Sequence, residues 1–244
     1  MRVERIKRLL EKSQILIEVV DARMIEKCRL REIEKKYQNK VVVVATKVDL
    51  IDEETKKEEG IFFVDNKTKE GIKELKDKIL QIGIEKLKKY SGPINVFVFG
   101  LPNVGKSSLI NALSGRKVAK TGFRAGITKG LQWIKLSDRI MLIDSPGVID
   151  KKIEKDILGL TASIDAQKIQ NPTKLANRII EMFFKKNKLE KLFSFFKISP
   201  DTKKGKVIEA IAKRRGFYMK GGKLNIEEAS RVIIREWQKG RLKI

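Results

Sequence analysis

The chain has 244 residues, 41% of them hydrophobic, which suits one large domain or one domain with a small appendage. It carries 55 Lys plus Arg against 31 Asp plus Glu, with no histidine and a single cysteine, so an intramolecular disulfide and a histidine-based zinc site are excluded. There is no run of about 18 apolar residues, and the charged start MRVERIKRLLEKSQ lacks an apolar signal core, so we expect a cytoplasmic protein with no membrane partner.

The net charge of +24 is spread unevenly along the chain. Residues 1–150 carry 31 basic and 21 acidic groups, net +10, whereas residues 151–244 carry 24 and 10, net +14. Abundant charge of both signs is typical of thermophile proteins, but ion-pair networks predict balanced charges. An excess concentrated in one segment instead favours a polyanionic partner such as RNA.

The first 144 residues alternate between strand and helix patterns. Continuous apolar runs such as ILIEVV and VVVVAT predict strands that are covered on both faces, as in parallel sheets. In chain order we expect strands at 15–20, 41–46, 61–64, 94–100, 131–136 and 139–144, with helices at 24–38, 71–90 and 106–115. This alternation predicts an α/β fold, a mostly parallel sheet with helices on both faces.

Beyond about Lys155 the pattern changes to helices only. Apolar positions at helical spacing fill 175–196, and a short basic helix is expected at 206–216. A third helix opens with Asn225 as its N-cap and ends at Gly240. We therefore predict an α/β domain over residues 1–154 and a small, basic, all-α domain over residues 155–244.

A phosphate-binding signature, GLPNVGKSS, follows a predicted strand and opens a helix. Its glycines allow the tight backbone whose N–H groups wrap phosphates, Lys106 supplies a cation for the terminal phosphates, and the Ser107 hydroxyl is a ligand for Mg²⁺. We predict nucleotide contacts from the residues of this loop: Gly100, Pro102, Asn103, Val104, Gly105, Lys106, Ser107 and Ser108.

A Mg-nucleotide site needs a second acidic contact at the end of a neighbouring strand, and IDSPG supplies it. We expect Asp144 to hold Mg²⁺, with Pro146 beside it and the N–H of Gly147 meeting the γ-phosphate. In the preceding AGITKG, Thr128 is the hydroxyl that we expect to reach Mg²⁺, with Thr121 as the alternative. The residues predicted to act on the transferred phosphate are Lys106, Thr128 and Gly147.

The string TKVDL, residues 46–50, ends a predicted strand ahead of the phosphate loop. Asp49 could accept from the ring N–H and the amino group of guanine, whereas adenine has no such pair of donors. The Lys47 stem would lie along the base, next to Thr46, and the N–H of Asn66 would meet the guanine carbonyl. The alternatives are a solvated Lys and Asp at a strand end, or an ATPase in which Asp49 plays no part.

The order of these motifs, TKVD, DNK, GLPNVGKSS, GITK and DSPG, resembles that of circularly permuted GTPases, specifically the ribosome biogenesis GTPase A-like family. EVVDAR (residues 18–23) and residues 211–242 resemble that family's opening strand and C-terminal helical module, so the likeness spans nearly the whole chain. The resemblance implies a circularly permuted P-loop GTPase fold with GTP or GDP and Mg²⁺ as cofactors. It also implies the large ribosomal subunit and its rRNA as partners, for a chain that we expect to be a monomer.

The resemblance leaves the hydrolytic step incomplete. Val148 stands where many GTPases carry a water-orienting glutamine, and the chain has no histidine to replace it. Asn103 resembles the asparagine with which potassium-dependent relatives bind K⁺, so K⁺ or a partner must supply the missing group. We expect slow GTP hydrolysis raised by K⁺ and by the large subunit. The alternative is a nucleotide-gated RNA-binding chaperone with negligible hydrolysis.

Two positions in the base-reading motifs depart from the family pattern. Thr46 replaces the commoner asparagine before Lys-x-Asp, and DNK stands where SAK is common, which weakens the expected contact from Asn66.

In the basic domain we expect RNA docking through cations with interleaved aromatic side chains: Arg214, Arg215, Phe217, Tyr218, Lys220 and Lys223. The alternative is a solvated basic face over an ordinary pair of helices.

Overall fold

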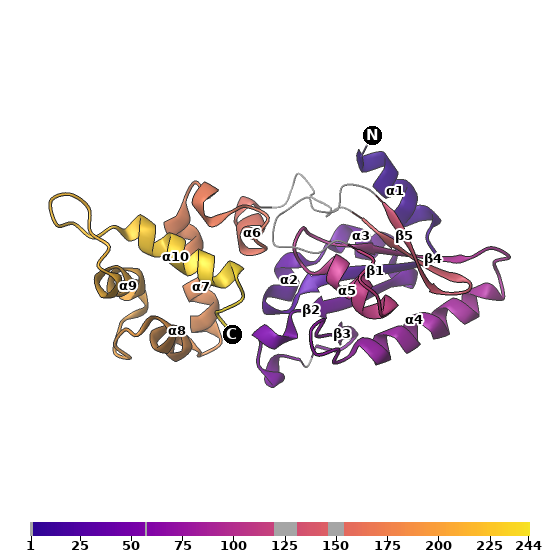
Figure 1. The fold of residues 1–244 in the computed structure, drawn as a ribbon, viewed down its shortest axis with the longest axis horizontal. Helices are drawn as coiled ribbons and strands as arrows, with labels where there is room; N and C mark the ends of the chain where they lie inside the picture. The colour runs from indigo at the N-terminus through magenta and orange to yellow at the C-terminus, as the bar shows by residue number, and fades with distance from the viewer. Residues whose placement is uncertain (1, 57, 120–130, 146–153) are drawn as a thin grey trace. The chain divides into compact units, whose positions relative to one another are not determined.

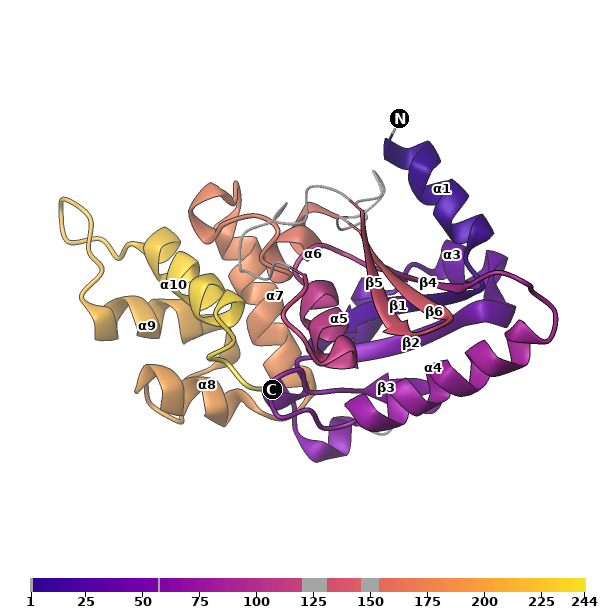
Figure 2. The ribbon, with the colours of Figure 1, turned by 45° about the vertical axis from the view of Figure 1, so that its right-hand side comes forward.

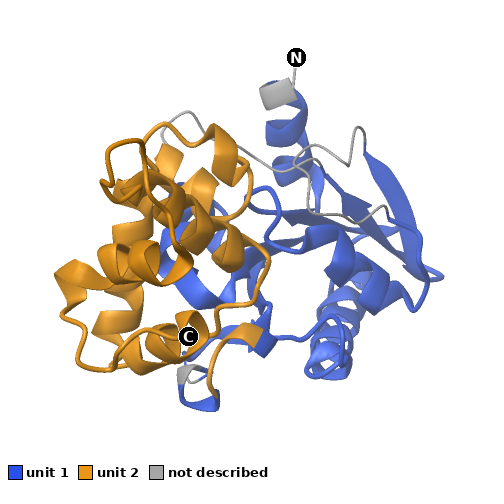
Figure 3. Ribbon diagram, turned by 60° about the vertical axis from the view of Figure 1, so that its left-hand side comes forward, with its two compact units in different colours: residues 1–49, 53–152 blue, residues 50–52, 153–244 orange. Residues whose placement is uncertain are grey.

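The computed structural model describes residues 2–56, 58–119, 131–145 and 154–244. Contacts divide the chain into two compact units, which are coloured separately in Figure 3. Unit 1 consists of residues 1–49 and 53–152, and unit 2 consists of residues 50–52 and 153–244. Three residues from the early part of the chain therefore belong with the later part.

Unit 1 is built around a six-stranded sheet with the order β3-β2-β1-β4-β6-β5 (Figure 1). Its strands are β1 (Ile15–Asp21), β2 (Val41–Thr46), β3 (Ile61–Phe63), β4 (Ile94–Phe99), β5 (Gln132–Ser137) and β6 (Ile140–Asp144). Among these strands β5 alone is antiparallel to its neighbour, β6. The predicted α/β fold with a mostly parallel sheet is confirmed.

The central strands are almost entirely apolar and buried. Every residue of β1 is buried, and β4 is buried except at Asn95. Register pairs Val19 with Val44 and Val96 with Leu142. These strands have no solvent-facing side, which is why their sequences lack the alternation of a half-exposed strand.

Helices cover both faces of this sheet (Figure 2). They are α1 (Arg2–Lys12), α3 (Arg31–Lys36), α4 (Ile72–Leu87) and α5 (Lys106–Ser114). On one face, Leu10 of α1 packs in a cluster with Phe97 of β4, and residues around α3 join them. On the other face, α4 lies so close to β6 that a Cβ on Gly83 would be 2.5 Å from Cδ1 of Ile140. A larger residue at this crossing would require the Ile140 side chain to shift.

The prediction of a single helix over residues 24–38 is wrong. The chain forms α2 (Ile25–Cys28) and then α3, with a break at Arg29 and Leu30. The buried Glu18 carboxylate of β1 accepts the Leu30 N–H, which would otherwise continue the helix. Burial raises the pKa of Glu18 to about 8.

Unit 2 is helical. It contains α6 (Lys155–Leu160), α7 (Pro172–Lys185), α8 (Leu189–Phe196), α9 (Val207–Arg215) and α10 (Ile226–Gln238). Trp237 lies at its centre, edge-on to Phe183 with ring centroids 6.4 Å apart, and its Nε1 donates to the Leu160 carbonyl at 3.1 Å. Asn225 caps α10 as predicted by accepting from the Glu228 N–H at 3.0 Å. No helix that the structure describes could cross a bilayer.

Residues Leu50–Asp52, which we call the inserted segment, pair with the last residue of the chain inside unit 2. The Ile244 N–H donates to the Leu50 carbonyl at 2.9 Å, and the Asp52 N–H donates to the Ile244 carbonyl at 3.2 Å. The Asp52 carboxylate also pairs with Lys188 and, at 2.7 Å, with Lys191. Backbone and charge contacts thus hold the inserted segment to the helices.

Candidate functional site

The predicted motifs meet at one edge of the sheet because parallel strands end there together. Register pairs Asp21 with Thr46 at the ends of β1 and β2, and Val98 with Asp144 near the ends of β4 and β6. Loops that follow the carboxyl ends of such strands are the usual ligand-binding positions of an α/β sheet. Motifs far apart in sequence are therefore neighbours in unit 1.

The loop between β4 and α5 has the tight backbone, with positive φ angles at its glycines, that the sequence predicted. Gly100 has φ 141°, and a Cβ there would lie 2.3 Å from the Val19 carbonyl oxygen. Gly105 has φ 109° and precedes the first turn of α5, and Asn103 is also left-handed with φ 59°. The loop therefore presents backbone N–H groups at a helix N-terminus, which suits an anion.

Lys106 lies inside this loop. Its Nζ donates to the carbonyls of Leu101 at 2.7 Å and Gly100 at 3.2 Å, and the side chain is almost fully buried. Burial lowers the pKa of Lys106 to about 8, although the charge of Asp144 acts in the opposite direction. A phosphate placed here would stabilise the charged ammonium.

Two oxygen ligands converge beside Lys106. The Ser107 hydroxyl, at the start of α5, donates to Oδ2 of Asp144 at 3.0 Å, and Asp144 is fully buried at the end of β6. The next hydroxyl, that of Ser145, donates to the Val98 carbonyl at 2.9 Å and fixes the start of the following loop. A hydroxyl and a carboxylate are hard oxygen ligands, so this pair fits Mg²⁺.

Thr46 ties the TKVD motif to the phosphate loop. Its buried Oγ1 contacts the carbonyl of Val104 and, at 3.2 Å, that of Val20. Val104 and its neighbour Pro102 are buried within the loop, whereas Ser108 is partly exposed on α5. The threonine that stands in place of asparagine therefore makes a direct connection between the two loops.

Lys47 and Asp49 both lie in charged contacts. Lys47 has φ 61°, and its Nζ is 2.9 Å from Oδ2 of Asp21. The Asp49 carboxylate is 2.5 Å from Nζ of Lys67 in the loop after β3. Asp49 is thus paired with Lys67 at the sheet edge, and Lys47 is anchored beside it by Asp21.

Asp21 and Arg23, for which no role was predicted, support this motif. Arg23 pairs with Asp21 at 2.8 Å, and both side chains are buried. Burial alone would raise the pKa of Asp21, but Arg23 and Lys47 hold it well below the usual value. An Asp at a strand end followed closely by Arg was the available signal.

Asn66 is held near the phosphate loop by the preceding residue. Asp65 is buried, and its Oδ1 accepts the N–H groups of Lys67 at 2.7 Å and Thr68 at 3.3 Å. The Asn66 Nδ2 lies 3.4 Å from the point that a Cβ on Gly105 would occupy. The structure therefore brings Asn66 to the same place as Thr46 and the phosphate loop.

Several predicted residues lie outside the described part of the chain. They are the two alternative threonines Thr121 and Thr128, together with Pro146, Gly147 and Val148. Their predicted parts in phosphate and Mg²⁺ binding stay predictions.

The predicted RNA-contacting residues belong to unit 2. Arg214 and Arg215 end α9, and a hairpin loop follows in which the Met219 N–H donates to the Lys223 carbonyl at 2.8 Å. Tyr218 is 55% exposed and Met219 is 51% exposed. The loop, which also carries Phe217 and Lys220, therefore displays aromatic, apolar and basic groups together.

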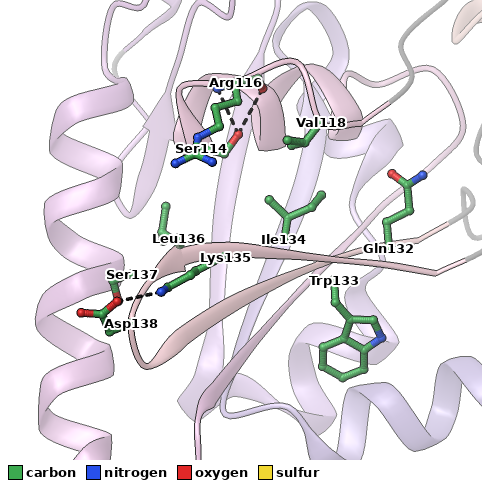
Figure 4. A pocket seen from close by; sticks show the side chains of 10 residues that line it. All are labelled: Ser114, Arg116, Val118, Gln132, Trp133, Ile134, Lys135, Leu136, Ser137 and Asp138. Carbon is green, nitrogen blue, oxygen red and sulfur yellow. Dashed lines mark hydrogen bonds and ion pairs between the residues drawn. The ribbon is translucent and has the colours of Figure 1, made fainter.

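A separate hollow of about 600 Å³ lies between the end of α5 and β5 (Figure 4). Ile134 and Leu136 point toward α5, whereas Trp133 points the other way and is 53% exposed. The described residues that line this hollow include none of the predicted nucleotide contacts, so we do not assign it to the nucleotide.

Comparison with known proteins agrees with this arrangement. A family profile described as "50S ribosome-binding GTPase" matches residues 95–212. An uncharacterized GTP-binding protein of Methanocaldococcus jannaschii is 32% identical over 97% of this chain, which spans 65% of that relative's length. Ribosome biogenesis GTPase A of Bacillus cereus is 30% identical over 93% of this chain and 83% of its own length.

Solved structures of similar proteins cover nearly the whole chain. A GDP-bound structure of TM YlqF has a TM-score of 0.68 and 25% identity, covering 98% of this chain and 96% of that chain. A GNP-bound YlqF from T. maritima has a TM-score of 0.62 and 25% identity, with coverage of 99% and 94%. Together with the site geometry, these likenesses show that the chain is a GTP-binding protein with a P-loop GTPase domain and belongs to the ribosome biogenesis GTPase A family.

Proposed function

We propose that this protein hydrolyses GTP to GDP and phosphate and acts as a nucleotide-gated assembly factor on the large ribosomal subunit. The observation that carries the proposal is the contact between the Thr46 hydroxyl and the Val104 carbonyl. It joins the base-reading motif to the phosphate loop, although 58 residues separate the two along the chain. A nucleotide could then place its base at one loop and its phosphates at the other.

In this proposal the base is recognised at the TKVD motif. The Asp49 carboxylate accepts from N1 and the amino group of guanine, and the Lys47 stem lies along the base. Asp49 exchanges its contact with Lys67 for these donors, and the backbone N–H of Asn66 meets the guanine carbonyl. Adenine lacks a matching pair of donors, so Asp49 favours guanine.

The phosphates are held by the loop from Gly100 to Ser108, with Lys106 against their terminal oxygens. Ser107 and Asp144 would hold Mg²⁺, joined by Thr128 when the γ-phosphate is present. Bound there, Mg²⁺ would neutralise charge on the β- and γ-phosphate oxygens. The N–H of Gly147 would contact the γ-phosphate.

The residues that orient the attacking water are incomplete in this chain. Val148 has no group that can hold a water molecule, and the sequence contains no histidine. We propose that K⁺ bound near Asn103, or a group of the ribosomal subunit, supplies the missing element. The family membership and the excess of basic residues in unit 2 support a ribosomal partner.

Single-turnover GTP hydrolysis with purified ribosomal subunits tests this function. We expect a slow basal rate, a higher rate in K⁺ than in Na⁺, and a further increase with large but not small subunits. Equal rates in all these conditions, combined with GTP-dependent co-sedimentation with the large subunit, would instead support the RNA-binding chaperone with negligible hydrolysis. Failure to bind either subunit in any nucleotide state would reject both.

A further inference from the structure

We propose that the side-chain amide of Asn66 donates a hydrogen bond to N7 of guanine. This inference rests on the proposed function, because it places guanine between Asp49 and the phosphate loop. It assigns the Asn66 carboxamide a contact separate from the one expected of the backbone N–H. The residue comes from the loop after β3 rather than from the TKVD motif itself.

Thr46 cannot fill this role in addition to the contacts that it makes. Its hydroxyl has a single proton, and two backbone carbonyls, those of Val20 and Val104, already lie within reach of Oγ1. The side chain is fully buried between them. The donor oxygen of a threonine is also one bond nearer the backbone than the amide nitrogen of an asparagine, so it reaches less far toward the base.

The Asn66 carboxamide lies next to this threonine, beside the phosphate loop. Its Nδ2 and the Thr46 Oγ1 are 3.4 Å and 3.0 Å from the same point, the position of a Cβ on Gly105. Its Oδ1 is buried and has no hydrogen-bond partner among the described residues. An unpaired acceptor calls for a donor, which N7 of guanine is not. The proposed contact therefore falls to Nδ2, whose two N–H groups lie beside Thr46 and Gly105.

Hydrogen bonds of neighbouring residues hold the backbone of the loop around Asn66. Asp65 accepts two backbone N–H groups through Oδ1, and its own N–H donates to the Glu70 carbonyl at 3.0 Å. The Lys69 N–H donates to the Asp65 carbonyl at 2.9 Å. These bonds fix the loop without using the Asn66 side chain, which leaves its carboxamide available for the nucleotide.

The chemistry of guanine fits a donor at this place. With N1 and the amino group directed to Asp49, the adjoining edge of the ring presents O6 and N7, and both are acceptors. The backbone N–H of Asn66 accounts for O6, and the amide Nδ2 accounts for N7. One residue would then bind both acceptors of this edge.

An analogue that lacks one atom tests the inference. In 7-deaza-GDP a C–H group replaces N7, which removes the acceptor and keeps the rest of the base. Calorimetric titration in Mg²⁺ should show that the wild-type protein binds 7-deaza-GDP roughly 3- to 10-fold more weakly than GDP, the range of one neutral hydrogen bond. Asn66→Ala should bind GDP more weakly by a similar factor and should not distinguish the two nucleotides.

A substitution in the same loop supplies the control. Thr68→Ala changes an exposed side chain two residues away and should keep both the GDP affinity and the preference over 7-deaza-GDP. If the wild type binds the two nucleotides equally, or if Asn66→Ala keeps the preference, the inference is wrong. In both of these cases the proposed function would stand as long as the wild type still binds GDP. Asp49→Ala tests that function separately, because an unchanged GDP affinity in this variant would contradict the proposed base-reading site.

Discussion

At the scale of single residues, the most unusual environment in the site is that of Lys106. An ammonium group is enclosed by its own loop, where two carbonyl oxygens replace water. Desolvation brings its pKa to about 8 from an ordinary value of 10.5. This environment favours the neutral amine at mildly alkaline pH, whereas phosphate oxygens would favour the cation.

This environment predicts proton uptake when nucleotide binds. At pH 9 Lys106 is mostly neutral in the free protein and charged in the complex, so GDP binding should take up a large fraction of a proton. At pH 6.5 Lys106 is charged in both states, so this group should take up no proton. Calorimetry in two buffers with different ionisation enthalpies measures the uptake. Equal proton uptake at the two pH values would contradict the prediction.

The same group links stability to pH. Between about pH 8 and 10.5 the unfolded chain keeps a proton on Lys106 that the nucleotide-free folded protein has lost, so this group's contribution to folding stability rises with pH across that window. Lys106→Met should remove this rise, and thermal unfolding at pH 7.5 and pH 9.5 compares the two proteins. Nearly identical pH dependence in wild type and variant would show that the buried amine is not responsible.

At the scale of secondary-structure elements, the local patterns were sufficient for most of unit 1. The strands and the loop after β4 could be predicted because apolar runs and glycine spacing are contained within each segment. The break between α2 and α3 could not, because it depends on the Glu18 carboxylate of another element reaching the Leu30 N–H. The contact of Thr46 with Val104 was equally hidden, since a threonine in this motif does not reveal its partner.

The hairpin loop after α9 carries a prediction about RNA. Arg214 and Arg215 lie in the last turn of α9, directly before this loop, and Tyr218 within the loop is exposed. The double variant Arg214→Glu, Arg215→Glu should weaken binding to large-subunit rRNA. The slope of log binding constant against log salt concentration should become shallower by roughly 2, because about two phosphate contacts are lost. Filter binding over a range of salt concentrations measures both effects.

A matched pair elsewhere in unit 2 controls for net charge. Lys155→Glu with Lys168→Glu reverses the same number of exposed cations and should leave the salt dependence nearly unchanged. If both double variants weaken binding equally, the interaction depends on overall charge, and the alternative of a solvated basic face holds.

At the scale of the whole molecule, the two units are interleaved in the chain. The inserted segment pairs with Ile244, which lies more than 190 residues later in the chain. No periodicity or composition within residues 50–52 indicates this pairing. By contrast, the order of the nucleotide motifs is visible in the sequence alone, and that order pointed to the permuted family.

This pairing makes the final residues important for the stability of unit 2. Ile244 is fully buried and Lys243 beside it is exposed. Ile244→Ala should lower the free energy of unfolding of unit 2 by roughly 2 kcal/mol, the lower end for a buried isoleucine, and Lys243→Ala should change it little. Fluorescence of the buried Trp237 during thermal unfolding reports on this unit when it is recorded in a Trp133→Phe background, because Trp133 belongs to unit 1. Equal stability of the two variants would mean that the contact contributes nothing.

The inserted segment also bears on how this protein can be divided. A protease cut after residue 152 would produce two polypeptides, yet the earlier one would keep residues 50–52, which belong to the folded body of the later one. The fragments should therefore remain together after cleavage and separate only under denaturing conditions. Removal of residues 153–244 altogether would instead uncover Leu50 and Ile51, both buried in the intact protein, and leave the shortened protein prone to aggregate.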